Sequence, residues 1–294
     1  MKRPGLRFWR RLCQSGAALT FVGVPLLNLC EIDLISGNLL SFNLAGLPFS
    51  DPLAALQVSA ATLSLPFTLS LGAGLALLLA LFMGPVFCSF ICPYGLFSEL
   101  AQKFSPLRGK KSNPGTAQKK SLPSLAGKIF LVCAGLSAVF FFAPAPLLNQ
   151  LSMPGWYSRA LQQAILHREL LPGAALILLI LALEVKVGKR FWCRYVCPQS
   201  LPLILAARLG KGILPQSLHL DFQRSSCTCP ASDRPCLAAC SLRLNPRTDQ
   251  SGQSLSCTNC GDCVEVCRDR GGALRLERGN HFPRPGSGNS VSGQ

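Results

Sequence analysis

Histidine is scarce in this chain of 294 residues. Only His167, His219 and His281 are present, and none lies inside the long apolar stretches that the sequence contains. A membrane b-type haem is held by two axial ligands inside such stretches, commonly histidines. The shortage of histidine therefore argues against a bis-histidine haem protein.

Charged residues are also few. They make up 14% of the chain, whereas apolar residues make up 49%, and this balance is too apolar for an ordinary soluble domain. Four stretches approach or exceed the roughly 18 apolar residues that indicate a membrane span: residues 12–30, 66–87, 129–148 and 170–187. We therefore expect a mainly α, four-transmembrane-helix polytopic protein. No small-residue cleavage site follows the first stretch, so we expect a retained span rather than a signal peptide.

Acidic residues are outnumbered by basic ones, 13 to 29, and the formal net charge is +16. Lys and Arg precede the first stretch, lie between the second and third, and follow the fourth, while residues 31–65 contain none. By the positive-inside rule this pattern predicts cytoplasmic N- and C-termini. Loops facing anionic lipid account for the charge. Because no aromatic platform is interleaved with them, we expect no nucleic-acid partner.

Cysteine, by contrast, is abundant: eight of the fifteen cysteines lie in two runs near the C-terminus. The second run, C-T-N-C-G-D-C-V-E-V-C, contains Cys257, Cys260, Cys263 and Cys267. Its C-x2-C-x2-C-x3-C spacing is typical of a [4Fe–4S] ferredoxin loop. The alternative is zinc, but a closed zinc site usually takes two separated C-x2-C pairs. The run therefore predicts iron, bound through these cysteines.

The first run is less regular. It has the spacing C-x-C-x6-C-x3-C and contains Cys227, Cys229, Cys236 and Cys240. In a two-cluster ferredoxin the fourth cysteine of each run ligates the other cluster. We therefore expect two [4Fe–4S] clusters with crossed ligation. One is held by Cys227, Cys229, Cys236 and Cys267, and the other by Cys257, Cys260, Cys263 and Cys240.

Two further cysteine pairs stand in matched positions, each after an apolar stretch. Cys88 and Cys92 lie in F-C-S-F-I-C-P, and Cys193 and Cys197 lie in W-C-R-Y-V-C-P. The proline that follows each second cysteine disfavours helix there, so we expect each pair where a helix ends. Four interpretations stay open: ligands of a further cluster, redox-active dithiols, the lining of a quinone pocket, or thiols that merely pack.

Other single residues are weaker candidates. Glu184 is an ionisable residue inside a predicted span, where it would either handle protons or extend toward water beside Lys186. Cys13, Cys30 and Cys133 are isolated in apolar stretches and are expected to pack.

Domain boundaries follow from these patterns. We expect a basic cytoplasmic N-terminus at 1–11, a four-span membrane domain at 12–218, a small α+β ferredoxin-like domain at 219–278, and a disordered tail at 279–294. Ser50-Asp51-Pro52 predicts a helix over 52–64 with Asp51 as its N-cap. A linker is expected at 105–127 and a surface helix at 201–214.

The chain resembles the NapH-type membrane ferredoxins, which are related to NosR, CcoG and MauN proteins. R-R-L-C-Q at 10–14, L-P-F-S-D-P-L-A-A-L-Q at 47–57, both C-x3-C-P motifs and the closing cysteine runs carry the resemblance. The C-x-C opening at 227–229 departs from the pattern. The resemblance implies four spans in a bacterial inner membrane, both termini inside, two C-terminal [4Fe–4S] clusters, and a role in quinol oxidation.

Three functions are compatible with these features. The first is an electron-transfer subunit of a quinol dehydrogenase, whose partners are membrane lipid, quinol and a ferredoxin-type or cytochrome subunit. The second is a CcoG-like assembly factor that reduces a metal or a thiol. The third is a zinc-bearing membrane scaffold. Arginines near the cysteine runs would raise cluster potential, dock an acidic partner or simply form a solvated face: Arg224, Arg234, Arg243, Arg268, Arg270 and Arg275.

Overall fold

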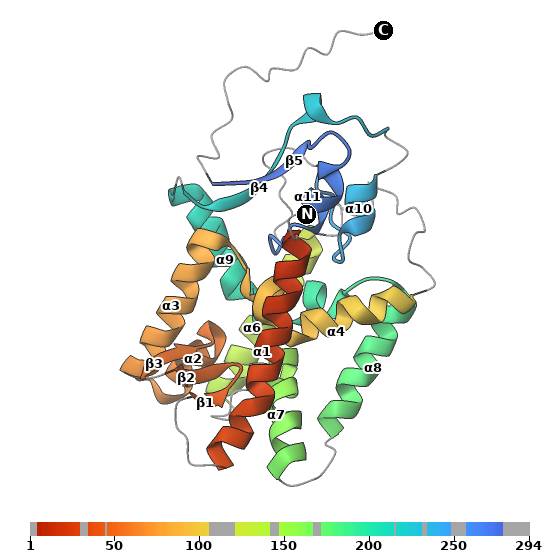
Figure 1. The fold of residues 1–294 in the computed structure, drawn as a ribbon. Coiled ribbons are helices and arrows are strands. Elements are labelled where there is room, and N and C mark those ends of the chain that lie inside the picture. The colour runs from red at the N-terminus through yellow and green to blue at the C-terminus, as the bar shows by residue number, and fades with distance from the viewer. Residues whose placement is uncertain are drawn as a thin grey trace.

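The computed structural model describes residues 5–29, 35–44, 46–105, 121–141, 147–166, 172–214, 216–230, 234–247 and 257–278. This part of the chain is mainly helical. A group of helices with a small sheet at one side forms the body, and the C-terminal segment forms a smaller layer at one end (Figure 1). The first turns of α1 (Leu6–Leu29) lie between the body and that layer.

The predicted four-span architecture is wrong. Within the described ranges, no helix combines the length and the apolar character that crossing a membrane requires. The four apolar stretches form α1 (Leu6–Leu29), α3 (Phe67–Met83), α6 (Ser121–Phe141) and α8 (Pro172–Val187). Two of these have 17 and 16 residues, fewer than the roughly 20 that a span needs. α1 includes three arginines and Pro25, and α6 includes Lys128.

The two C-x3-C-P motifs also have matching backbone surroundings. After α3 and after α8 the chain passes through a glycine of positive φ, Gly84 or Gly188. It then forms a single π-helical turn, η1 (Phe87–Ile91) or η4 (Trp192–Val196). These turns contain the first cysteine of each C-x3-C-P motif. A helix follows each motif, α4 (Pro93–Ala101) or α9 (Ser200–Ile213). The prediction that each pair lies where a helix ends is confirmed.

A three-stranded antiparallel sheet was not predicted. Strands β1 (Ile35–Asn38), β2 (Ser41–Leu44) and β3 (Leu47–Ser50) pair in that order. They lead into α2 (Pro52–Thr62), where the Asp51 carboxylate accepts a hydrogen bond from the amide of Ala54, so the predicted N-cap is confirmed. α2 packs against α3 and α6. The 3-10 turns η2 (Gln102–Phe104) and η3 (Leu147–Leu151) and helix α7 (Met153–Leu166) complete the body.

The C-terminal layer contains α and β elements. Strands β4 (Leu218–Phe222) and β5 (Leu274–Arg278) form an antiparallel pair. Between them lie η5 (Arg224–Ser226), α10 (Pro235–Ala239) and α11 (Asp262–Arg268). Residues 106–120 of the expected linker and the tail from 279 lie outside the described residues, whereas 121–127 belong to α6.

Buried ion pairs fasten this layer to the body. The Arg10 guanidinium on α1 contacts Glu99 on α4, with Nη2 2.8 Å from Oε2. The same nitrogen lies 3.0 Å from Oδ2 of Asp262 on α11. Arg7 adds a 3.0 Å contact from Nε to Asp262. The first turns of α1 therefore hold the helix that contains Cys263 and Cys267 against the body.

Candidate iron–sulfur sites

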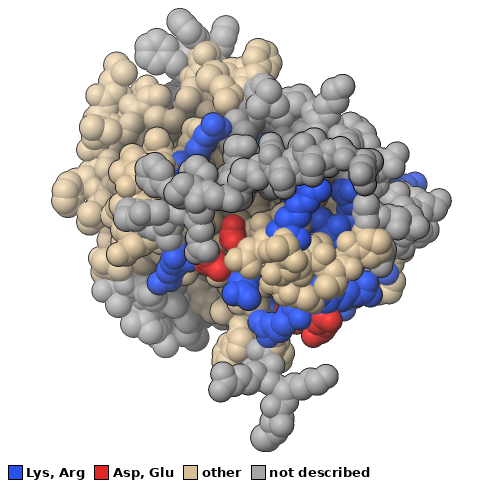
Figure 2. All heavy atoms as spheres, turned by 90° about the horizontal axis from the view of Figure 1, so that it is seen from above, with Lys and Arg blue, Asp and Glu red and all other residues tan. Residues whose placement is uncertain are grey.

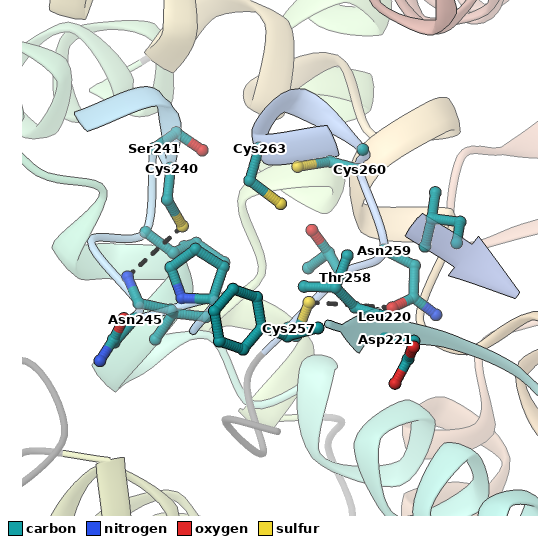
Figure 3. A pocket seen from close by; sticks show the side chains of 16 residues that line it. Leu220, Asp221, Cys240, Ser241, Asn245, Cys257, Thr258, Asn259, Cys260 and Cys263 are labelled. Carbon is teal, nitrogen blue, oxygen red and sulfur yellow. Dashed lines mark hydrogen bonds between the residues drawn. The ribbon is translucent and has the colours of Figure 1, made fainter. Parts of the chain in front are cut away.

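The structure brings the predicted crossed ligands together. Cys240 from the first run and three cysteines from the second, Cys257, Cys260 and Cys263, line one small cavity of about 60 Å³. We call these four residues the inner set. Figure 3 shows their sulfur atoms turned toward a shared space, with Cys240 approaching from a different segment than the other three. The donor set fits a cubane, which takes one thiolate at each iron.

Local backbone geometry explains how the loop winds so tightly. Asn259 and Gly261 have φ values of 51° and 76°, a region that asparagine tolerates and glycine favours. The Asn259 amide donates hydrogen bonds to the carbonyls of Met83 and Leu218, both at 3.1 Å. The loop is thus fixed to the end of α3 and to β4.

Hydrogen bonds and burial also affect the charge state of the thiols in the inner set. The amide of Leu244 donates to the Cys240 sulfur at 3.4 Å, a kind of contact that tunes cluster potential. Burial raises the pKa of Cys240 to about 11 and that of Cys260 to about 12. Because the thiolate is the metal ligand, these groups require a bound cation to ionise at neutral pH.

The remaining cysteines gather beside the inner set. Cys236 and Cys267 are buried in one apolar cluster, and Cys227 packs against it. Arg247 hydrogen-bonds Cys236 and lies within electrostatic range of both Cys227 and Cys229. We call Cys227, Cys229, Cys236 and Cys267 the outer set.

The two C-x3-C-P pairs form a third gathering of thiols. Cys88, Cys92, Cys193 and Cys197, which we call the cysteine quartet, all line a cavity of about 740 Å³. Burial raises the pKa of Cys92 to about 11 and that of Cys197 to about 12, and nearby Cys193 raises both further. In each motif the second cysteine amide donates to the carbonyl five residues earlier, at 2.9 Å. Single π turns of this kind are frequent at functional sites.

Polar groups are few in the wall of this large cavity, which is formed mostly by apolar and aromatic side chains. Lys128 on α6 donates from Nζ to the Cys193 carbonyl at 2.9 Å and to the Ser200 hydroxyl at 2.5 Å. The Gln199 amide donates to the Asp51 carboxylate at 3.1 Å. Burial raises the pKa of Asp51 to about 6, although hydrogen bonds from its neighbours oppose the shift.

The cavity reaches from the cysteine quartet to the inner set. Leu242 and Thr258, which lie beside Cys240 and Cys257, belong to its wall. Arg194 in η4 donates to the Leu242 carbonyl at 3.0 Å. The C-terminal layer is therefore seated directly on the C-x3-C-P turns.

Sequence reasoning missed several residues of these sites. Lys128 and Arg190 were expected only as charges of cytoplasmic loops. In the structure both are buried, with exposed fractions of 1% and 4%. The available signal was the position of Lys128 immediately before an apolar stretch. Glu184 is also fully buried, so its extension toward water is wrong. Its carboxylate accepts hydrogen bonds from the Ser98 hydroxyl and, at 3.1 Å, from the Trp192 amide.

One other expectation is corrected. Cys13 and Cys133 are exposed rather than packed, while Cys30 lies outside the described residues. No three His, Cys, Asp or Glu side chains in the described ranges are placed to hold a single metal ion. A cubane is bound differently, since each thiolate takes its own iron.

Comparisons with known proteins identify the class. A family model described as a 4Fe-4S binding domain matches residues 65–113 and 170–215, the segments that contain the cysteine quartet. These segments are thus similar to a 4Fe-4S binding domain, and the chain is related to ferredoxin-type proteins. No solved structure matches it.

Individual relatives are ferredoxin-type proteins. The ferredoxin-type protein NapH of Haemophilus influenzae is 28% identical over 90% of this chain and 87% of its own length. NapH of Escherichia coli is 27% identical over 88% and 85%. The methylamine utilization ferredoxin-type protein MauN of Methylobacillus flagellatus is 27% identical over 88% and 74%. The predicted resemblance to NapH and MauN is confirmed, and these relatives support iron–sulfur clusters as cofactors.

Proposed function

We propose that this chain takes electrons from quinol at the large cavity and passes them through the inner and outer sets to a redox partner. The observation that carries the proposal is the continuity of the three groups of thiols. One apolar cavity of about 740 Å³ touches the cysteine quartet and also Thr258 and Leu242 beside the inner set. Cavities of this size that are largely apolar, with a few fixed polar groups, are typical ligand sites.

The inner and outer sets would each hold one [4Fe–4S] cluster, which when bound supplies one-electron transfer. The protein's own groups determine how easily each cluster accepts or releases an electron. Arg247 beside the outer set and the Leu244 amide on Cys240 favour negative charge on the sulfur atoms. Shared packing of Cys236, Cys267 and Cys263 keeps the two sets adjacent and dry.

Quinol oxidation also releases protons, which the cavity wall has to accept. Asp51 lies in that wall with its carboxylate held by Gln199. Its pKa of about 6 lies close to neutral pH, where a group both takes and releases a proton readily. Asp51 is therefore the proposed proton acceptor.

The redox partner would dock on the basic face of the C-terminal layer. Figure 2, which looks onto this end of the molecule, shows Lys and Arg side chains gathered with few Asp or Glu among them. Arg224, Arg268 and Arg275 of this layer are exposed. An acidic patch on a partner would be steered to such a surface, and the association would weaken as salt rises.

The test is anaerobic mixing of the full chain with a soluble quinol analogue, followed by electron paramagnetic resonance. We expect reduced-cluster signals to appear, and Ala76→Trp, which fills the cavity from α3, to slow their appearance at least tenfold. Leu71→Trp is the matched control, because Leu71 is exposed on the same helix and does not line the cavity. Reduction that is absent, or equally fast in both variants, contradicts quinol oxidation at this cavity.

A further inference from the structure

A second polar cavity, of about 110 Å³, lies where the start of α1, the end of α4 and the C-terminal layer meet. Its volume is several times the roughly 15 Å³ that one water molecule needs, so it has room for a small ion. Four basic side chains from three separate segments line it: Arg7, Arg11, Lys103 and Arg243. The proposed function gives this cavity no role.

Local backbone geometry gathers the basic residues. Arg7 and Arg11 are four residues apart on α1, so they lie on one face of that helix. Gln102 and Lys103 belong to η2, directly after α4. Arg243 has a φ of 53°, which a residue other than glycine seldom adopts. Residues in such conformations are frequent at ligand sites.

The acidic side chains of the wall already have cationic partners. Glu99 and Asp262 line the cavity, and each forms an ion pair with Arg10. By contrast, neither Arg11 nor Lys103 forms an ion pair within the part of the chain that the structure describes. The charge that is left over in the wall is therefore positive.

Two hydrogen-bond donors of the wall also lack an acceptor. Arg11 Nε and Gln102 Nε2 are buried, and neither atom has a hydrogen-bond partner among the described residues. Both residues line the cavity. A buried donor without an acceptor is costly, and an anion with several oxygen atoms would accept from both donors. We propose that this cavity binds a phosphate group.

Phosphate suits the donors better than other small anions do. A guanidinium group binds two phosphate oxygens at once, which a single-atom anion such as chloride does not allow. A tetrahedral anion also presents oxygens on several sides, and the donors here come from several segments. A phosphate monoester carries nearly two negative charges at pH 7, which matches the two unpaired cations, Arg11 and Lys103.

A free phosphate ion and a lipid headgroup present the same chemistry to this cavity. Basic pockets between helices bind lipid headgroups, and aromatic side chains are common at the level of the headgroups. Exposed apolar side chains stand beside the basic residues in the sequence: Phe8, Trp9, Leu12 and Phe104. The test therefore compares the two sources of the phosphate group.

The experiment is calorimetric titration of the full chain with inorganic phosphate at constant ionic strength. We expect one saturable site with a dissociation constant of about 1 mM or below. Arg11→Met and Lys103→Met each remove one charge-assisted contact and should weaken binding about tenfold. Arg208→Met, at an exposed arginine outside the cavity, is the matched control and should bind as the wild type does.

Denaturation series give an independent readout. A ligand that binds only the folded chain stabilises it as its concentration rises, so phosphate should raise the denaturation midpoint of the wild type and of Arg208→Met. The midpoint of the Arg11→Met and Lys103→Met variants should respond much less. Measured without phosphate, the same series shows that each variant is folded.

Titration with a short-chain phosphatidic acid, below its micelle concentration, separates the two sources. Binding about tenfold tighter than that of inorganic phosphate, and again weakened in Arg11→Met, assigns the site to a lipid headgroup. Equal affinity for the two compounds assigns it to a free phosphate group. Either result supports the proposed site.

Two results would overturn it. One is a wild-type chain without saturable binding of either compound, and the other is an affinity that stays the same in both Arg11→Met and Lys103→Met. The site does not rest on the proposed function, because binding of phosphate requires neither quinol nor a cluster. Clusters that quinol fails to reduce would therefore contradict the proposed function and leave this inference standing.

Discussion

The Ser89 hydroxyl, between the two cysteines of the first C-x3-C-P motif, donates a 2.8 Å hydrogen bond to the carbonyl of Thr258, beside Cys257. Ser89 is 1% exposed. This bond joins two cysteine sites that are 169 residues apart in the chain. The C-terminal layer is therefore attached to the body by a specific hydrogen bond and not by packing alone.

Ser89→Ala removes that bond and leaves a buried carbonyl without its donor. We expect the free energy of unfolding to fall by about 1–2 kcal/mol, measured by chemical denaturation, with slower electron transfer into the inner set. Ser137→Ala, at an exposed helical serine, is the control. An unchanged stability would show that the contact does not hold the layer in place.

Arg10→Met breaks the pairs with Glu99 and Asp262 at once. Because buried Glu99 then keeps only the longer contact with Arg190 and Asp262 keeps only Arg7, we expect the free energy of unfolding to fall by about 3 kcal/mol, together with iron loss from the inner set. Thermal unfolding and metal analysis measure both effects. Arg208→Met, at an exposed arginine, should have little effect, and equal losses in the two variants would contradict the role of Arg10.

Asp51 should make stability depend on pH. Since burial raises its folded-state pKa from 3.8 to about 6, the folded chain binds the proton more tightly than the unfolded chain. The stabilisation that comes from protonated Asp51 is therefore fully present below about pH 4 and is lost as pH rises through 6, by about 3 kcal/mol. Asp51→Asn keeps the N-cap and should flatten this slope in denaturation series. Asp269→Asn is the control, and a slope that persists in Asp51→Asn refutes the assignment.

Crossed ligation gives a distinctive pattern of losses. Cys267→Ser should remove the cluster of the outer set, although Cys267 belongs to the second run, and Cys240→Ser should remove that of the inner set. Each loses about four irons, and paramagnetic resonance distinguishes which signal remains. If Cys240→Ser instead removed the signal that Cys227→Ser removes, ligation would follow the runs and would not be crossed.

The local chemistry of the site was predictable because it depends on short spacings. The spacing of the four cysteines from Cys257 to Cys267 is enough to predict a cluster-binding loop. Pro93 and Pro198 are enough to predict non-helical backbone at the cysteines that precede them. The sheet β1–β3 was missed because its strands have four residues each and no clear alternation. The predicted spans were wrong because apolar composition does not reveal that α3 ends before Gly84, or that α1 and α6 include charged residues such as Arg10 and Lys128. Lys128 was missed because its partners lie 65 and 72 residues away.

Mössbauer spectroscopy on anaerobically isolated, iron-labelled full chain, together with zinc and sulfide analysis, tests the central claim most directly. The account predicts cubane-type iron, sulfide equal to iron, and no stoichiometric zinc. Colourless protein that contains zinc at the cysteine sets, or iron without sulfide, would contradict it.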